Sequence, residues 1–348
     1  MKKIIYVGLC VMISVFLMGC TAKEDKPAIT TEAVTKTPET EAPETEVQET
    51  EAISSEIILN YPKDMQALGF TEPVILEGMP TNVVSITVAP VLAMYELGID
   101  FAAVPSSMVV RWPDDIDAET LPSVTSENFD IELVVALNPD LVVMGYTSAD
   151  THGATLTELG IPVYYVTAGH VASYESVKMQ TAALIEGLAV TEEAKAAGEN
   201  IMNRFAELET KLEELKAIYA DKKVMVLQSS PPAHYIQTSG GTLGSMLDMM
   251  GFENVYTNAS SSMVQLDLEV ALEYNPDLVV CVGMSPTGEA HKAVMDEDQA
   301  NNPEYWGSID AFVEGNVIYL PVGYVSTAGI NLIDIIQDLM DTVEAHYN

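Results

Sequence analysis

The sequence predicts an α/β protein built from two similar lobes. Beyond residue 57, short apolar runs alternate with amphipathic stretches, which is the pattern of buried strands between helices. The segment over 131–143 reappears, with substitutions, over 268–280. A spacing this long indicates a duplicated domain rather than a solenoid repeat. A proline-free segment over 173–220, strongly helical in composition, separates the two copies.

The first residues have the pattern of an export signal. Lys2 and Lys3 precede an uncharged apolar run over 4–18. This run is shorter than the roughly 20 residues that a membrane-spanning helix needs. It ends in Leu17-Met18-Gly19-Cys20, which resembles a lipobox, the cleavage and lipidation site of bacterial lipoproteins. We therefore expect a signal peptide over 1–19 and acyl chains such as palmitate on Cys20; an uncleaved membrane anchor is the alternative.

Residues 20–56 are expected to form a disordered linker. They are rich in Thr, Glu, Pro and Ala. Low hydrophobicity and repeated like charge favour an extended, solvated tether over a packed core. The folded body therefore begins near residue 57.

Six apolar runs of the body are predicted strands. Most are continuous and rich in valine, as central strands of parallel sheets are. The runs cover 82–86, 141–144, 163–166, 224–227, 278–282 and 317–320.

Each copy of the repeat predicts a short helix, a stop and a strand. Glu132 and Glu269 lie in the first turn of the two helices, and an Asn-Pro-Asp stop follows each helix. The segment between the copies has an expected break over 187–191, because Thr191 followed by two glutamates is typical of a new helix start.

The charge of the chain excludes several classes of partner. It has 52 acidic and 15 basic residues, a formal net charge of −37. A protein this acidic repels nucleic acids and anionic lipid surfaces. Three cysteines are too few for a disulfide framework, and Cys281 is expected to be a buried, inert thiol.

Several motifs, taken in order, carry a family resemblance. They are 82–90 with the helix that ends before Gly98, both Pro-Asp-Leu-Val-Val copies, 159–163, and 238–244 followed by 251–256. Over about 58 to 345 the chain resembles the substrate-binding proteins of ABC importers for iron–siderophores, haem and cobalamin. The resemblance implies two Rossmann-like lobes (57–172 and 221–348), each with a mainly parallel central sheet, joined by a single long α-helix within 173–220.

The resemblance also implies partners and a location. The partners are an ABC permease and its ATPase, and the location is the outer face of the bacterial cytoplasmic membrane, where the chain would act as a lipid-anchored monomer without enzymatic activity. Glu132 and Glu269 match the surface glutamates that dock into arginine pockets of the permease. Two carboxylates on separate lobes can report the gap between those lobes. The alternative is that each acid only stabilises the first turn of its helix.

The ligand of such a protein lies between the lobes, against loops that follow the strands. Arg111 beside Trp112 suits a carboxylate on a large conjugated ligand. The alternative is a solvated Arg111 that pairs with Asp114 or Asp115. The candidate ligand-binding residues are Thr87, Ser107, Met108, Arg111, Trp112, Asn128, Tyr146, His234, Tyr235, Met284, Trp306 and Tyr324.

The scarcity of basic residues argues against a strongly anionic siderophore and leaves a neutral, cationic or mildly acidic metal chelate. The expected cargo is an iron complex such as haem or a ferric siderophore, with a corrinoid as the alternative; no resident cofactor is expected. Haem would need an axial ligand, for which His234 and Met284 are the main candidates, with Met108 and Tyr324 also considered. A corrinoid needs only stacking, by Trp112, Tyr146 and Trp306.

Two other classes of protein are the alternatives, an enzyme and a cell-surface adhesion lipoprotein. An enzyme is disfavoured because the glycine-rich turn over 239–244 lacks the lysine of a phosphate-binding loop. The chain also has no HExxH or GxSxG motif and no His and Cys cluster typical of zinc. A cell-surface adhesion lipoprotein would fit the acidic tether but not the duplicated α/β body.

Overall fold

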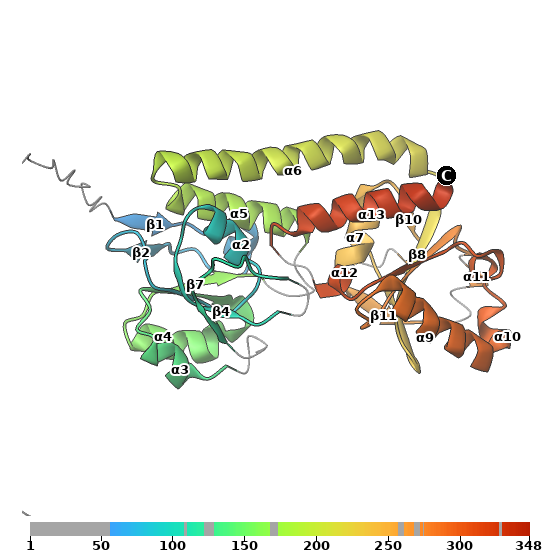
Figure 1. Ribbon diagram of the computed structural model, residues 1–348, viewed down its shortest axis with the longest axis horizontal. Coiled ribbons are helices and arrows are strands. Elements are labelled where there is room, and N and C mark those ends of the chain that lie inside the picture. The colour runs from blue at the N-terminus through green and yellow to red at the C-terminus, as the bar shows by residue number, and fades with distance from the viewer. Residues whose placement is uncertain are drawn as a thin grey trace, which may run out of the picture. The chain divides into compact units, whose positions relative to one another are not determined.

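The computed structural model describes residues 56–107, 110–121, 129–167, 173–256, 261–267, 272–273, 275–326 and 329–348 (Figure 1). The expectations for the signal peptide, for Cys20 and for nearly all of the tether lie outside these ranges. Those for Met108, Asn128 and Glu269 also lie outside them.

The N-terminal lobe has a five-stranded sheet with the order β5-β4-β3-β6-β7, and every neighbouring pair is parallel. Its strands are β3 (Val83–Ser85), β4 (Phe101–Pro105), β5 (Glu119–Leu121), β6 (Leu141–Gly145) and β7 (Val163–Val166). Helical segments between them are α2 (Val91–Glu96), α3 (Ile131–Ala136), η1 (Tyr146–Ser148), η2 (Ala149–Gly153) and α4 (Ala154–Glu158). A separate antiparallel pair, β1 (Ile57–Leu59) and β2 (Val74–Leu76), encloses α1 (Lys63–Ala67).

The C-terminal lobe has a mixed sheet with the order β11-β9-β8-β12-β13, and β10 pairs with the start of β8. The pairs of β8 with β10 and β12, and of β12 with β13, are parallel, whereas β9 pairs antiparallel with β8 and β11. The strands are β8 (Lys223–Ser230), β9 (Ala233–Gln237), β10 (Glu253–Asn254), β11 (Met263–Gln265), β12 (Leu278–Val282) and β13 (Val317–Leu320). The helices are α7 (Thr242–Met249), α9 (Gly288–Asn301), α10 (Pro303–Trp306), α11 (Asp310–Glu314), α12 (Gly323–Ser326) and α13 (Leu332–Tyr347).

The predicted α/β class with two lobes is confirmed. All six predicted strands are present, as β3, β6, β7, β8, β12 and β13. The duplication is visible in the topology, because β6 lies beside β3 in one sheet and β12 lies beside β8 in the other. Each repeated Asn-Pro-Asp begins with an asparagine in the left-handed region, at φ 49° for Asn138 and 37° for Asn275.

The segment between the lobes folds as two helices, α5 (Tyr174–Leu188) and α6 (Glu192–Tyr219). Thr191 begins the second helix, since its hydroxyl accepts a hydrogen bond of 3.1 Å from the amide of Ala194. The 28 residues of α6 make a rod of about 42 Å. A buried stripe along it, with Ile201, Phe205 and Leu208, explains why so long a helix is stable.

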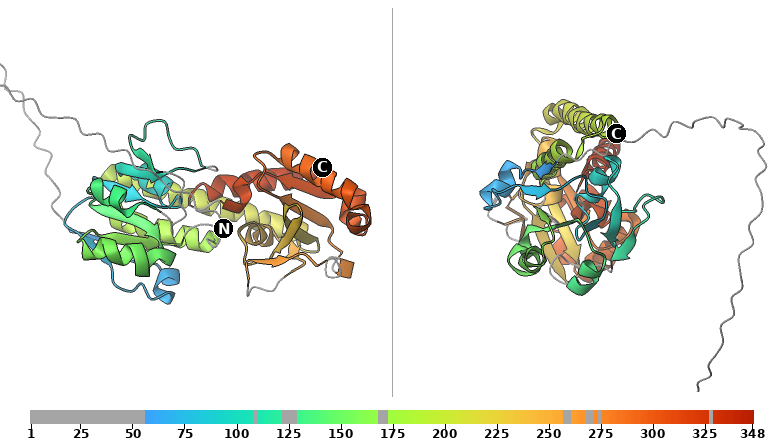
Figure 2. Two further views of the ribbon diagram at one scale, coloured as in Figure 1. Left: turned by 90° about the horizontal axis from the view of Figure 1, so that it is seen from below. Right: turned by 90° about the vertical axis from the view of Figure 1, so that its left-hand side faces the viewer.

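The long helix α6 contacts both lobes. It packs on α2 of the N-terminal lobe and on α7 and α13 of the C-terminal lobe, and it runs beside α13 (Figure 1, Figure 2). Arg204 on α6 forms an ion pair of 2.9 Å with Glu96 at the end of α2. Lys211, two turns further along, donates a hydrogen bond of 2.7 Å to Gln337 of α13. A single rod thus joins the lobes. In the part of the chain that the structure describes, every helix is too short or too polar to span a bilayer.

Candidate ligand-binding site

The side chains of β8 point alternately to the two faces of the C-terminal sheet. Val224 and Val226 belong to a core cluster that includes α7 and α13 and also Ala93 of α2 in the other lobe. Met225 and Leu227 belong to a second cluster, with side chains from α9, α10 and α11. Because side chains alternate along a strand, Gln228 continues the first face and Ser229 continues the second. Each of these two faces carries a cavity.

The cavity on the first face has a volume of about 250 Å³, and we call it the glutamine pocket. It is on the sheet face whose core also reaches the N-terminal lobe. None of the described side chains that line it is ionisable. The lining residues are Gln228, Gln237, Gly241, Thr242, Ser262, Met263, Met284 and Val325.

Two hydrogen-bonded glutamines form the polar part of this pocket. Gln237, which is only 3% exposed, accepts hydrogen bonds at its Oε1 from the backbone amides of Leu243 at 3.0 Å and Gly244 at 3.4 Å. Its Nε2 donates a hydrogen bond of 2.9 Å to Oε1 of Gln228. The glutamine pair is therefore anchored on the first turn of α7.

Two of the predicted ligand-binding residues lie at this face. Met284 lines the pocket, and its side chain is 60% exposed. Tyr235 is paired directly with Gln228 in the β8–β9 ladder, which puts the two side chains on the same side of the sheet, and it is 40% exposed. An aromatic ring and a thioether are thus available to a ligand beside the amide groups.

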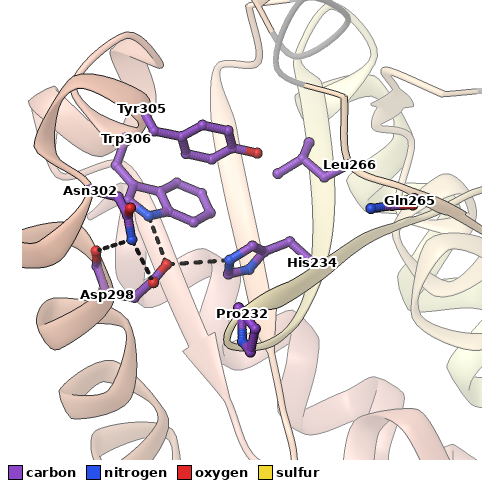
Figure 3. A pocket seen from close by; sticks show the side chains of 8 residues that line it. All are labelled: Pro232, His234, Gln265, Leu266, Asp298, Asn302, Tyr305 and Trp306. Carbon is purple, nitrogen blue, oxygen red and sulfur yellow. Dashed lines mark hydrogen bonds and ion pairs between the residues drawn. The ribbon is translucent and has the colours of Figure 1, made fainter.

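The cavity on the second face has a volume of about 320 Å³, and we call it the histidine pocket (Figure 3). Its lining residues are Pro232, His234, Gln265, Leu266, Asp298, Asn302, Tyr305 and Trp306. Three polar side chains, those of His234, Asn302 and Trp306, converge on Asp298. Oδ2 of Asp298 lies 3.3 Å from Nε2 of His234 and accepts a hydrogen bond of 2.8 Å from Nε1 of Trp306. Its Oδ1 accepts one of 3.0 Å from Asn302.

His234 is held at both ring nitrogens. Nδ1 lies 2.8 Å from the hydroxyl of the buried Ser229, and Nε2 faces Asp298. Burial lowers the pKa of His234, and the charge of Asp298 opposes this shift. The arrangement favours the neutral imidazole and ties the β8–β9 hairpin to α9 and α10. Among the described residues, no group of three or more His, Cys, Asp or Glu side chains is placed to hold a metal ion.

Comparison with known proteins gives the family. The model of a periplasmic binding protein family matches residues 83–323, which is more than half of the chain. The chain belongs to this family of periplasmic binding proteins. Members are transport components and not enzymes, and the resemblance found in the sequence motifs is confirmed.

Solved structures share the fold. An ABC transporter substrate-binding protein from Listeria monocytogenes has 21% identity and a TM-score of 0.61, and the match covers 76% of this chain and 98% of that one. S. aureus IsdE complexed with heme has 20% identity and a TM-score of 0.59, with coverage of 75% and 98%. The vitamin B12 binding protein BtuF of Vibrio cholerae has 15% identity and a TM-score of 0.57, with coverage of 77% and 98%. No curated protein matches the sequence significantly.

In the N-terminal lobe of this binding protein, the predicted site residues are held by local contacts. Thr87 is buried, and its carbonyl accepts a hydrogen bond of 2.7 Å from Ser85. The Ser107 hydroxyl accepts one of 2.9 Å from the amide of Val110. Trp112 donates its indole N–H to the carbonyl of Pro105 at 2.8 Å. Tyr146 is half-buried, with its ring 6.4 Å from that of Phe70.

Arg111 is in the arrangement that the sequence left as its alternative. Its guanidinium pairs with Asp114 at 2.9 Å, and the two side chains are 87% and 84% exposed. Asp115 instead accepts a hydrogen bond of 2.7 Å from Tyr95. An exposed pair of this kind contributes little to stability.

Two predicted aromatic residues of the C-terminal lobe are buried in its core. Trp306 is 2% exposed, and its ring packs at 4.9 Å from both His234 and Phe312. Tyr324 is also 2% exposed and donates its hydroxyl to Asp338 on α13. The structure therefore brings Trp306 together with His234 on one face of the sheet, and it places Tyr235 and Met284 on the other face. Cys281 is fully buried as expected, and burial raises the pKa of its thiol.

The sequence did not single out Gln228 or Met263 as site residues. Their role depends on which face of a strand each residue occupies, and on a register with β9 that no local motif specifies.

Proposed function

We propose that this binding protein is the extracytoplasmic, lipid-anchored receptor of an ABC importer. It captures a metal-chelate nutrient between its two lobes and delivers it to a permease, without chemistry of its own. The glutamine pocket is the observation that carries the proposal. It is concave and uncharged, and it lies on the sheet face whose core extends to the other lobe. Few precisely placed polar groups in an otherwise apolar hollow are typical of small-molecule sites.

The proposed cargo is an iron complex, either haem or a ferric siderophore. The S. aureus relative is described as complexed with heme, and its fold is shared by this chain. Met284 supports haem in particular, because a thioether is a known axial ligand of haem iron and this side chain is 60% exposed at the pocket. His234 is less suitable, since both of its ring nitrogens already have partners.

A corrinoid is the second candidate, and the neutral lining of the glutamine pocket favours it. A corrinoid brings its own metal ligands and requires only stacking and hydrogen bonds from the protein. Tyr235 offers an exposed ring, and Gln228 and Ser262 offer polar groups beside it.

Visible absorption titrations test the cargo. The purified protein is titrated separately with haem, with a ferric hydroxamate siderophore and with cyanocobalamin. A saturable spectral change with one of them supports the proposal, and no change with any of the three overturns the chelate assignment. If haem binds through Met284, Met284→Ala will shift the Soret band. Met263→Ala, which removes a second thioether from the same pocket, is the control for lost packing without lost ligation.

The lipid anchor has its own test. Cys20→Ala should leave the protein uncleaved and unlipidated, because this side chain is the proposed acceptor of the acyl chain. Metabolic labelling with a radioactive fatty acid should mark the wild-type protein and not the variant. Equal labelling of the two proteins would reject Cys20 as the anchor.

A further inference from the structure

The two glutamines of the glutamine pocket have a fixed orientation. A backbone N–H can only donate, so the amides of Leu243 and Gly244 require an acceptor, and Gln237 must present its oxygen to them. The close approach of α7 to this strand depends on a glycine. A Cβ at position 244 would lie 2.1 Å from the carbonyl oxygen of Thr238.

The orientation of Gln237 determines that of Gln228. With its oxygen occupied by α7, Gln237 has only its NH₂ group left, and this group meets the Gln228 side chain at 2.9 Å. Gln228 must therefore use its own oxygen as the acceptor. Its NH₂ group has no acceptor among the described residues, although Gln228 is half-buried and lines the pocket.

The chain of hydrogen bonds gives the pocket a polarity. It begins at the N-terminal turn of α7, where the helix dipole is positive. Hydrogen bonds in series polarise one another, so the terminal NH₂ becomes a better donor than an isolated amide. Among the residues that the structure describes, no carboxylate lines the pocket to compete for that donor, although the whole chain has a net charge of −37.

We propose that Gln228 is a specificity-determining residue, whose Nε2 donates a hydrogen bond to an acceptor oxygen of the cargo. The inference rests on the proposed function. It restricts the cargo to ligands that place a carbonyl, amide or carboxylate oxygen beside Gln228. Amide side chains of a corrinoid, propionates of haem and the acyl oxygens of a hydroxamate all present such an oxygen. A ligand that offers only donors here, such as a primary ammonium, is rejected.

The test uses whichever of the three probes named above gives a saturable spectral change with the wild-type protein. Gln228→Glu replaces the donor by a charged acceptor of the same shape, and we expect affinity to fall by about tenfold or more, roughly 1.4 kcal/mol. Gln228→Leu deletes the donor, together with the oxygen that accepts from Gln237, but adds no charge, and its loss should be smaller.

Gln237→Glu tests the relay itself. A glutamate can still accept from α7 but can no longer donate, so Gln228 would turn its NH₂ inward and expose its oxygen to the cargo. We expect the affinity to fall about as much as in Gln228→Glu, although Gln237 itself is only 3% exposed. Gln299→Glu is the matched control. It adds the same charge on α9, which packs on the opposite face of the sheet, so affinity should stay within about twofold.

A measurement without any ligand separates the inference from the proposed function. In the NMR spectrum of the free protein, the side-chain amide protons of Gln237 should exchange with solvent far more slowly than those of the exposed Gln265. Equal exchange rates overturn the relay, whatever the cargo is. Unchanged probe affinity in both Gln228→Glu and Gln237→Glu overturns the role of Gln228 and leaves the transport function standing. If none of the three probes binds, the chelate assignment fails, and equal exchange rates would still overturn the relay.

Discussion

The backbone amide of Lys223 donates a hydrogen bond of 2.7 Å to the carboxylate of Asp277, and this contact has a counterpart in the other lobe. There the amide of Thr81 donates one of 2.7 Å to Asp140. Each aspartate ends one copy of the repeated Asn-Pro-Asp, and each holds the start of the strand that pairs with its own. In both lobes, the aspartate of the repeat thus fixes the neighbouring strand in the sheet.

Asp140→Ala should therefore destabilise the protein. Asp140 accepts from the amides of Thr81 and Asn82 and from the hydroxyl of Thr81, so its removal leaves several donors without a partner. We expect a loss of about 1.5–3 kcal/mol in the free energy of unfolding, measured with urea. Asp221→Ala removes an exposed acid that has no hydrogen bond within the described residues, and it serves as the control. Equal losses in the two variants would deny Asp140 this role.

Three glycines with nearly the same positive φ allow the cost of backbone strain to be separated from the cost of a steric contact. Gly69, Gly251 and Gly329 have φ of 101°, 101° and 100°. A Cβ at Gly69 would meet nothing within 4 Å, whereas one at Gly251 would lie 2.7 Å from the backbone of Lys216 and one at Gly329 would lie 2.2 Å from Ala89 O. Gly69→Ala should cost only the strain, of order 1–3 kcal/mol.

The other two glycine variants should cost about 1–3 kcal/mol more, because the backbones must move apart. Gly251→Ala acts where α6 meets the C-terminal lobe, and Gly329→Ala acts where the segment before α13 touches the loop after β3. Urea unfolding of all three variants gives the comparison. If they are equally destabilised, these close backbone contacts contribute nothing beyond the shared conformation.

The sequence predicted the fold where apolar periodicity alone determines the structure. Continuous valine runs such as 278–282 are strands in any parallel sheet, and all of them were found. Strand β9 was missed because Ala233–Gln237 alternates polar and apolar residues and ends beside a glycine-rich turn. It forms a strand because it pairs with β8 and β11, and a pattern read within a few residues does not contain those pairings.

The residues of the site were harder to predict than the strands, because the composition of a segment does not determine which side chains point into a pocket. Trp306 and Tyr324 were expected in loops that follow strands, as ligand-binding aromatics are. They lie in α10 and α12 instead, and their polar atoms bond to Asp298 and Asp338 and fix both rings in the core. Gln228 has no chemical signature of its own. Its importance appears only when α7 is seen to orient Gln237.

Tyr324→Phe tests whether Tyr324 stabilises the core or binds the ligand. Because the hydroxyl donates to Asp338 in a buried setting, its loss should lower the free energy of unfolding by about 1–3 kcal/mol. The affinity for the bound chelate, measured by the same absorption titration, should not change by more than about twofold. A large loss of affinity in a protein of normal stability would instead return Tyr324 to the ligand site.

The histidine pocket predicts a pH dependence of stability. Burial lowers the pKa of His234, so the folded state favours the neutral imidazole. Below the ordinary pKa of about 6.5 the unfolded chain binds more protons than the folded one, and stability falls as the pH falls. Asp298 opposes the shift, and Tyr305 and Trp306 are the other side chains around the ring.

His234→Gln should reduce the drop in melting temperature between about pH 7.5 and about pH 5. Its melting temperature near neutral pH should fall as well, because the contacts with Ser229 and Asp298 are lost. His291, whose pKa burial also lowers, would account for part of the remaining slope. His152→Gln in the N-terminal lobe is the control. A slope that is the same in His234→Gln and in the wild type would assign the acid sensitivity to other groups.

Glu132 offers the sharpest test of delivery to a permease. It lies exposed in the first turn of α3, and the helix is already capped by Asp130, whose carboxylate accepts from the amides of Glu132 and Leu133. The Glu132 carboxylate itself has no ion pair within the described residues. A role limited to the helix dipole would be worth about 0.3–1 kcal/mol of stability and would leave uptake intact.

The double variant Glu132→Ala with Glu269→Ala should bind the chelate with unchanged affinity and abolish its uptake by cells that depend on this protein. Docking pairs the two acids with fixed cations on the membrane partner, and such pairs control recognition more than folding. Glu158→Ala, which removes another exposed acid of the N-terminal lobe, should retain uptake. If the double variant loses chelate affinity in solution, these acids act on the ligand and not on docking. If uptake persists with normal affinity, the dipole alone explains their placement.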